Sequence, residues 1–154
     1  MQEIKAVADQ LKRAYEGEAW HGPSLKEILA DVTAEQAARR PIAGAHSIWE
    51  IVLHIAAWEG TVRARLEGEY LLEPSKGDWP AVEETGEAAW RDALTKLESN
   101  HMKLRESIAR LDGARLFEPL AEGKPSSYFT LHGIIQHDLY HAGQIAVLKK
   151  AVTP

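Results

Sequence analysis

The sequence predicts an all-α protein, a four-helix bundle with a crossover connection. Four long segments carry apolar residues at helical spacing, and residues that break helices separate them. β-Branched residues never alternate with polar ones over the length of a strand. The chain of 154 residues has the length of one domain, so we expect residues 1–154 to fold as a single unit. The long connections favour a topology other than simple up-and-down.

The first predicted helix covers residues 2–18. A connector follows, and Pro23 or Ser24 can begin a short helix near its start. Thr33 and Gln36 have the spacing of a capping box, which predicts a second short helix. Pro41 ends it, because the residue before a proline avoids the helical region. The face of the first helix is formed by Ile4, Val7, Leu11 and Tyr15.

Three more long helices are predicted. The second runs from residue 46 or 47 to 66, and the loop 68–84 contains two prolines and two glycines. The third covers 85–111, with Thr85 as its expected cap. After a loop at 116–127, the fourth begins near residue 130 and ends near 151.

Composition excludes several function classes. The chain has 18 Lys and Arg against 23 Asp and Glu, a net charge of −5, so we expect no general nucleic-acid binding. It has no cysteine, which excludes disulfides, thiolate metal sites and cysteine nucleophiles. No apolar run could span a bilayer, and the first residues do not resemble a signal peptide. We therefore expect a cytoplasmic protein with no membrane partner.

Three of the seven histidines indicate a metal site. His137 and His141 are four residues apart in a predicted helix, which places both imidazoles on one face. His54 lies in an almost wholly apolar run of the second long helix, so it can supply a third ligand from a facing helix. Three imidazoles suit a first-row divalent ion with a position open for water or substrate. The alternative is that these are buried polar residues with ordinary hydrogen bonds.

Two further residues are candidates for assisting chemistry. Glu50 lies one turn before His54 on the same face, so it could orient a ligand or act as a base; the alternative is a surface charge near the helix end. Gln144 lies one turn after His141 and could hydrogen-bond a ligand or substrate. The remaining polar residues are expected elsewhere: Asp138 at the surface, His101 exposed beside Lys103, and Tyr140 in the core.

Two segments resemble the DinB-like family of four-helix proteins. They are residues 46–59 (HSIWEIVLHIAAWE) and 131–145 (LHGIIQHDLYHAGQI), and residues 20–25 (WHGPSL) add to the resemblance. The family pattern has one ligand histidine in the second helix and an H-x-x-x-H pair in the last. The resemblance therefore implies a divalent ion, often zinc or nickel, held by His54, His137 and His141.

The same resemblance implies a class of reaction without fixing it. The superfamily includes bacillithiol and mycothiol-dependent transferases, in which the metal activates the thiol of a small cosubstrate. We therefore expect a metal-dependent S-transferase with a small-molecule substrate. A metal-dependent hydrolase is the first alternative, and a non-enzymatic protein that binds a metal or a small molecule is the second. A symmetric homodimer is the default expectation for a small bundle.

Overall fold

The computed structural model describes residues 2–153 and shows an all-α protein, as predicted. No strand occurs among these residues, and one isolated bridge joins Pro119 to Ser126. The helices are α1 (Gln2–Glu16), α2 (Leu25–Leu29), α3 (Ala34–Ala38), α4 (Ile48–Leu66), α5 (Glu87–Ala109) and α6 (Ser127–Val152), with a 3₁₀ turn at Gly113–Arg115.

Local capping explains where most helices begin. Ser24, Thr33 and Ser47 each accept a hydrogen bond from the backbone N–H three residues later, and each belongs to a complete capping box. Helix α5 differs from the prediction, because Gly86 rather than Thr85 precedes it and supplies no side-chain cap. Helix α6 begins earlier than predicted, since Ser126 accepts a hydrogen bond from the Phe129 N–H.

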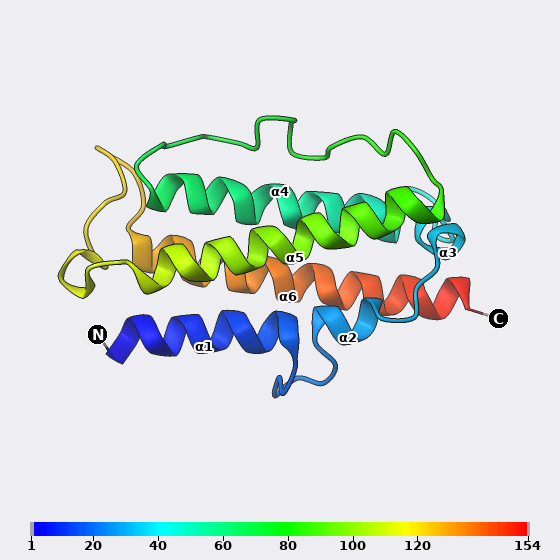
Figure 1. Ribbon diagram of the computed structural model, residues 1–154, viewed down its shortest axis with the longest axis horizontal. Helices are drawn as coiled ribbons and strands as arrows, with labels where there is room; N and C mark the ends of the chain where they lie inside the picture. Colours follow the sequence, from blue (N-terminus) through cyan, green and yellow to red (C-terminus); the bar gives the residue numbers. More distant parts are fainter. Residues whose placement is uncertain (1, 154) are drawn as a thin grey trace.

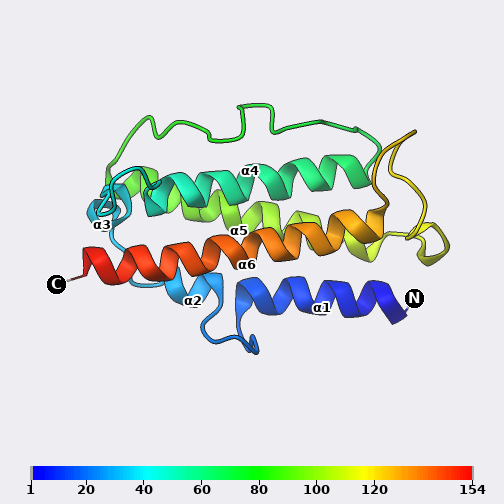
Figure 2. The ribbon, with the colours of Figure 1, turned by 180° about the vertical axis from the view of Figure 1, so that it is seen from behind.

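The four long helices pack side by side (Figure 1). α4 and α5 run in the same direction, because the segment between them, residues 67–86, passes back along the length of the bundle. α1 and α6 run the opposite way. Seen from behind, α6 lies beside both α1 and α4 (Figure 2). This arrangement makes α4 and α6 antiparallel neighbours, so the middles of the two helices face each other.

The apolar core consists of two clusters, one toward each end of the bundle. One contains the first half of α4 with the second half of α6, and the other contains α1 with the first half of α6. Between the clusters, each of α4, α5 and α6 contributes a buried polar residue: Glu59, His101 and Asp138. We call these three residues the polar layer. No helix within residues 2–153 has the length and apolarity that a membrane span requires.

Candidate metal centre

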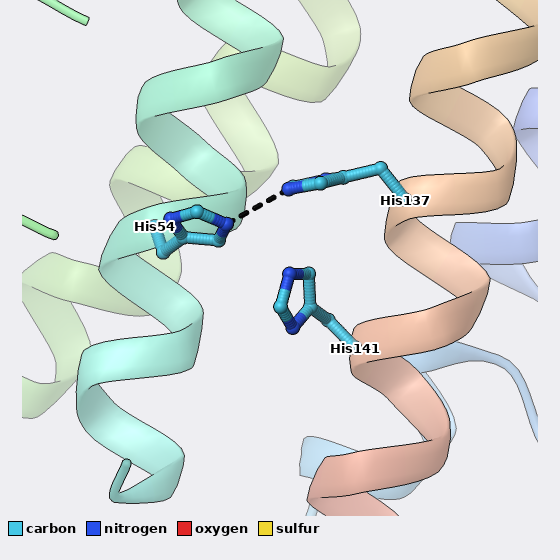
Figure 3. A group of neighbouring side chains, drawn as sticks. All are labelled: His54, His137 and His141. Atoms are coloured by element: carbon cyan, nitrogen blue, oxygen red, sulfur yellow. Dashed lines mark hydrogen bonds between the residues drawn. The ribbon is translucent and has the colours of Figure 1, made fainter. Parts of the chain in front are cut away.

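The three predicted histidines meet between α4 and α6. Each offers a ring nitrogen, and these nitrogens lie within 4.8 Å of one another. Figure 3 shows the three imidazoles converging, His54 from α4 and the other two from α6. His54 and His141 are buried, whereas the side chain of His137 is 24% exposed. The cluster is therefore anchored in the core and reachable from solvent on the side of His137.

Each imidazole has an oxygen acceptor beside its Nδ1 atom. The Nδ1 of His54 lies 2.6 Å from the backbone oxygen of Asp78. The Nδ1 of His141 lies 2.6 Å from the Gln144 Oε1. The Nδ1 of His137 lies 3.3 Å from the Asp138 Oδ1. A backbone carbonyl can only accept, so the Nδ1 of His54 carries the proton, and the other two contacts favour the same tautomer.

The Nε2 atoms therefore present lone pairs to the centre of the cluster. The Nε2 atoms of His54 and His137 lie only 2.8 Å apart. Burial lowers the pKa of His137 and of His141 to about 4, and it also lowers the pKa of His54. The histidines are thus neutral near pH 7, the state that binds a metal ion. Three converging imidazole nitrogens fit a divalent first-row ion.

The crossing segment 67–86 closes one side of the cluster. Beyond the carbonyl contact with His54, the Asp78 carboxylate accepts a hydrogen bond of 2.7 Å from the Trp58 indole. The Trp79 ring stacks on His54 with the centroids 3.9 Å apart, and on its other face it stacks on His46 at 3.6 Å. His54 is therefore held from both its edge and its face.

The two predicted assisting residues occupy different surroundings. Gln144 contacts the site directly, through the hydrogen bond with His141. The Glu50 carboxylate completes the capping box at Ser47 and pairs with Arg40. Burial alone would raise the pKa of Glu50, but the hydrogen bonds from Ser47 and Arg40 outweigh it and lower that pKa. No hydrogen bond joins Glu50 to the three histidines in the described structure. Catalytic roles for Glu50 and Gln144 stay predictions.

A comparison with protein families identifies the chain. A family model described as the DinB superfamily matches residues 19–145, a span that contains all three histidines. The chain belongs to the DinB superfamily. No curated protein and no solved structure matches it significantly. Membership in the DinB superfamily and the three-histidine cluster together fit a metal-binding protein.

Three residues lie where the sequence analysis did not expect them. Asp138 was expected at the surface and His101 exposed, yet both are buried, at 5% and 0% exposure. Tyr140 was expected in the core and is 66% exposed. The expectation for Asp138 came from its angle of about 100° from His137 on the helix, and that for His101 came from its polar neighbours Asn100 and Lys103. Asp138 and His101 each occupy a position in the apolar stripe of their helix, as His101 does between Leu97 and Leu104.

The polar layer adjoins the histidine cluster through Asp138. The Glu59 Oε1 lies 2.9 Å from the Nδ1 of His101, and the carboxyl groups of Glu59 and Asp138 are near enough to affect each other's pKa. Burial raises the pKa of both carboxyl groups well above their ordinary values. The Glu59 Oε2 has no hydrogen-bond partner among the described residues.

Sequence reasoning missed the contribution of the crossing segment. Asp78 and Trp79 lie in a loop with no periodic pattern, and their contacts with His54 depend on how that loop crosses the bundle. A tryptophan between Asp78 and Pro80 was the one available signal, because a large aromatic residue in a loop usually packs on something.

Proposed function

We propose that this DinB-superfamily protein is a metal-dependent enzyme of the S-transferase type. His54, His137 and His141 would hold the ion through their Nε2 atoms. The observation that carries the proposal is that all three Nδ1 atoms face oxygen acceptors while the Nε2 atoms converge. Acceptors of this kind fix the tautomer and orientation of ligating histidines in metal sites.

The three nitrogen donors limit which metal ion can bind, and they determine whether a coordination position remains for the reacting group. Three nitrogen ligands would leave at least one coordination position open, and the side chain of His137 is 24% exposed to solvent. A bound divalent ion supplies Lewis acidity, which lowers the pKa of a thiol or a water at an open position. Zinc and nickel both accept imidazole ligands, and we expect one of them.

A pocket beside the cluster suits the electrophilic substrate. It has a volume of about 550 Å³ and is lined mainly by apolar groups, with Gln144 and His46 among its walls. Gln144 also hydrogen-bonds to His141, and His46 stacks on the Trp79 that covers His54. We propose that the apolar part of the substrate occupies this pocket while a low-molecular-weight thiol approaches the metal.

The first test concerns the metal. Untagged protein purified without a nickel column should contain about one equivalent of zinc or nickel by elemental analysis. His137→Ala should lose it. His132→Ala is the matched control, because His132 lies on the same helix, is also half-buried and is outside the cluster. If the parent contains no metal and fails to take up added zinc or nickel, the proposal is wrong.

The second test concerns the reaction. The metal-loaded protein should conjugate an apolar electrophile in the presence of bacillithiol, mycothiol or glutathione, and it should be inactive without a thiol. The hydrolase alternative uses the same three ligands, but it predicts turnover of ester or amide substrates without a thiol. The non-enzymatic alternative predicts neither, together with a large fall in melting temperature when the metal is removed.

A further inference from the structure

One face of α6 is left uncovered by the rest of the bundle. Seen from behind, α6 lies in front of the other helices, and none of the described segments passes over it (Figure 2). Six positions on this face recur at alternating spacings of four and three residues, so they share one side of the helix. We call them the outer stripe: Phe129, Gly133, Gln136, Tyr140, Gly143 and Val147.

The outer stripe exposes apolar side chains and carries no charge. Phe129 is 67% exposed, Tyr140 66% and Val147 58%. Between residues 128 and 147 the one carboxyl or Lys/Arg side chain of α6 is Asp138, and it is buried. Helices α1 and α5, by contrast, expose charged side chains of both signs. Two copies of a chain with a net charge of −5 repel each other, so a neutral face is where they can approach most closely.

The two glycines of the outer stripe have no packing role within one chain. A Cβ atom added at Gly133 or at Gly143 would meet no other atom within 4 Å. Glycine inside a helix is destabilising relative to alanine, so a single copy would be more stable with alanine at both positions. The close approach of a second backbone is a reason to have glycine there.

The spacing of the outer stripe reads the same in both directions about residue 138. We propose that the outer stripe is the contact between two copies of this chain, paired antiparallel about a two-fold axis beside that residue. Such a contact is self-complementary, as a two-fold dimer requires. The pairs across it are Phe129 with Val147, Gly133 with Gly143, and Gln136 with Tyr140.

The exposed apolar area suits a contact of this kind. Half of the exposed large hydrophobic side chains among the described residues lie on this face or at its edge: Ile42, Phe129, Tyr140 and Val147. Together they present roughly 400 Å² per copy, which is about half of the roughly 800 Å² per partner that a standard interface buries. The glycine backbone, Gln136 and the exposed residues 41–44 beside Ile42 are available for the remainder.

The same contact would close the pocket beside the histidine cluster. Tyr140, Gly143 and Val147 line that pocket and also belong to the outer stripe. In the antiparallel pair, the first half of the second copy's stripe, which begins with its Phe129, lies over these three residues. Each copy therefore supplies an outer wall for the pocket of the other. The contact itself is independent of the proposed function, and only the use of the closed pocket for a substrate rests on it.

The first experiment measures the mass of the full chain in solution. Sedimentation velocity over a range of protein concentrations should show a dimer. Phe129→Glu should raise the dissociation constant of the dimer about 100-fold, because each dimer would bury two carboxylates against apolar side chains. The variant should fold, since glutamate at this position completes a capping box with Ser126. Met102→Glu is the matched control, because Met102 is a 53% exposed apolar residue on α5.

Cysteine cross-linking tests the register, and the chain has no cysteine of its own. A mixture of Gly133→Cys and Gly143→Cys should form a disulfide between copies, since a disulfide requires Cα atoms within about 7 Å. Neither variant alone should do so, because like positions lie about 15 Å apart along the antiparallel helices. A cross-link in either variant alone, or none in the mixture, would overturn the antiparallel register.

A third cysteine tests whether the contact closes the pocket. Ala45 lines the pocket, so Ala45→Cys should react with a maleimide several-fold faster when Phe129→Glu is also present. Equal rates would overturn the closure. A chain that stays monomeric at every concentration, or a dimer that Phe129→Glu leaves unchanged, would overturn the contact. None of these readouts depends on metal binding or on turnover, so the failure of the proposed function would be seen separately.

Discussion

The Nε2 atoms of His54 and His137 lie 2.8 Å apart, although each ring already has an oxygen acceptor beside its Nδ1 atom. Two neutral imidazoles arranged in this way direct two lone pairs at each other. A proton between them or a shared cation relieves the repulsion, and the third lone pair from His141 favours the cation. Four predictions follow from this site and the residues around it.

Gln144 should support metal binding through His141. Gln144→Ala removes the acceptor of the His141 Nδ1–H, so we expect metal affinity to fall about 10-fold. Gln144→Glu keeps an acceptor and should bind the metal close to the parent level. Gln136→Ala, an exposed substitution on the same helix, is the control. Isothermal titration with zinc measures all three, and equal affinities for the parent and Gln144→Ala would contradict the assignment.

Metal removal should loosen the crossing segment 67–86. Its contacts with the cluster include the Asp78 carbonyl and the Trp79 ring, both on His54. A ligand that fixes His54 should also hold this segment, so chelation should speed tryptic cleavage after the exposed Lys76. Cleavage after Arg115, in the connection between α5 and α6, provides the internal control. Identical rates at Lys76 with and without metal would show that the segment is not coupled to the site.

The metal-free protein should lose stability as the pH falls from about 6.5 to about 4. An unfolded histidine takes up a proton near pH 6.5, whereas burial lowers the pKa of His137 and of His141 to about 4. Between these values the unfolded chain binds more protons, so acid favours unfolding in that window. Urea midpoints at pH 7.0, 5.5 and 4.5 measure the effect. A variant with both histidines replaced by glutamine should lose less stability over this pH range. Equal losses in the variant and the parent would refute the explanation.

Glu50 should matter more for stability than for metal binding. Its carboxylate caps α4 at Ser47 and pairs with Arg40. Glu50→Ala should therefore lower the free energy of unfolding by about 1 kcal/mol, the usual size of a lost cap interaction. Metal stoichiometry and affinity should not change. Urea denaturation and zinc titration on the same preparation check both parts, and a loss of affinity with unchanged stability would restore Glu50 to the site.

Much of this architecture could be predicted from the sequence, because helical periodicity and capping residues act locally. The four long helices and both short connector helices lie close to their predicted ranges. The positions of His137 and His141 follow from their spacing alone. His54 required the further assumption that a polar residue in an apolar run faces a partner.

The parts that could not be predicted depend on contacts between distant residues. The stack of Trp79 on His54 and the contact of Glu59 with His101 join segments that no local pattern connects. A charged residue in an apolar stripe has two explanations, a solvent-facing helix edge or a buried partner. Only the partner distinguishes them, as His101 does for Glu59.

The polar layer lies between the two apolar clusters, so we expect the two halves of the molecule to open separately. One apolar cluster lies on each side of it, and both share the long helices α4, α5 and α6. Helices that unfold from one end of the bundle lose apolar contacts first. At Glu59 and His101 the apolar packing is interrupted by hydrogen-bonded groups. An ion held by His54 and His141 would lie near this boundary and would link α4 to α6. Amide hydrogen exchange would then slow on both sides of the boundary when the metal binds, giving the two halves one common opening rate in place of two.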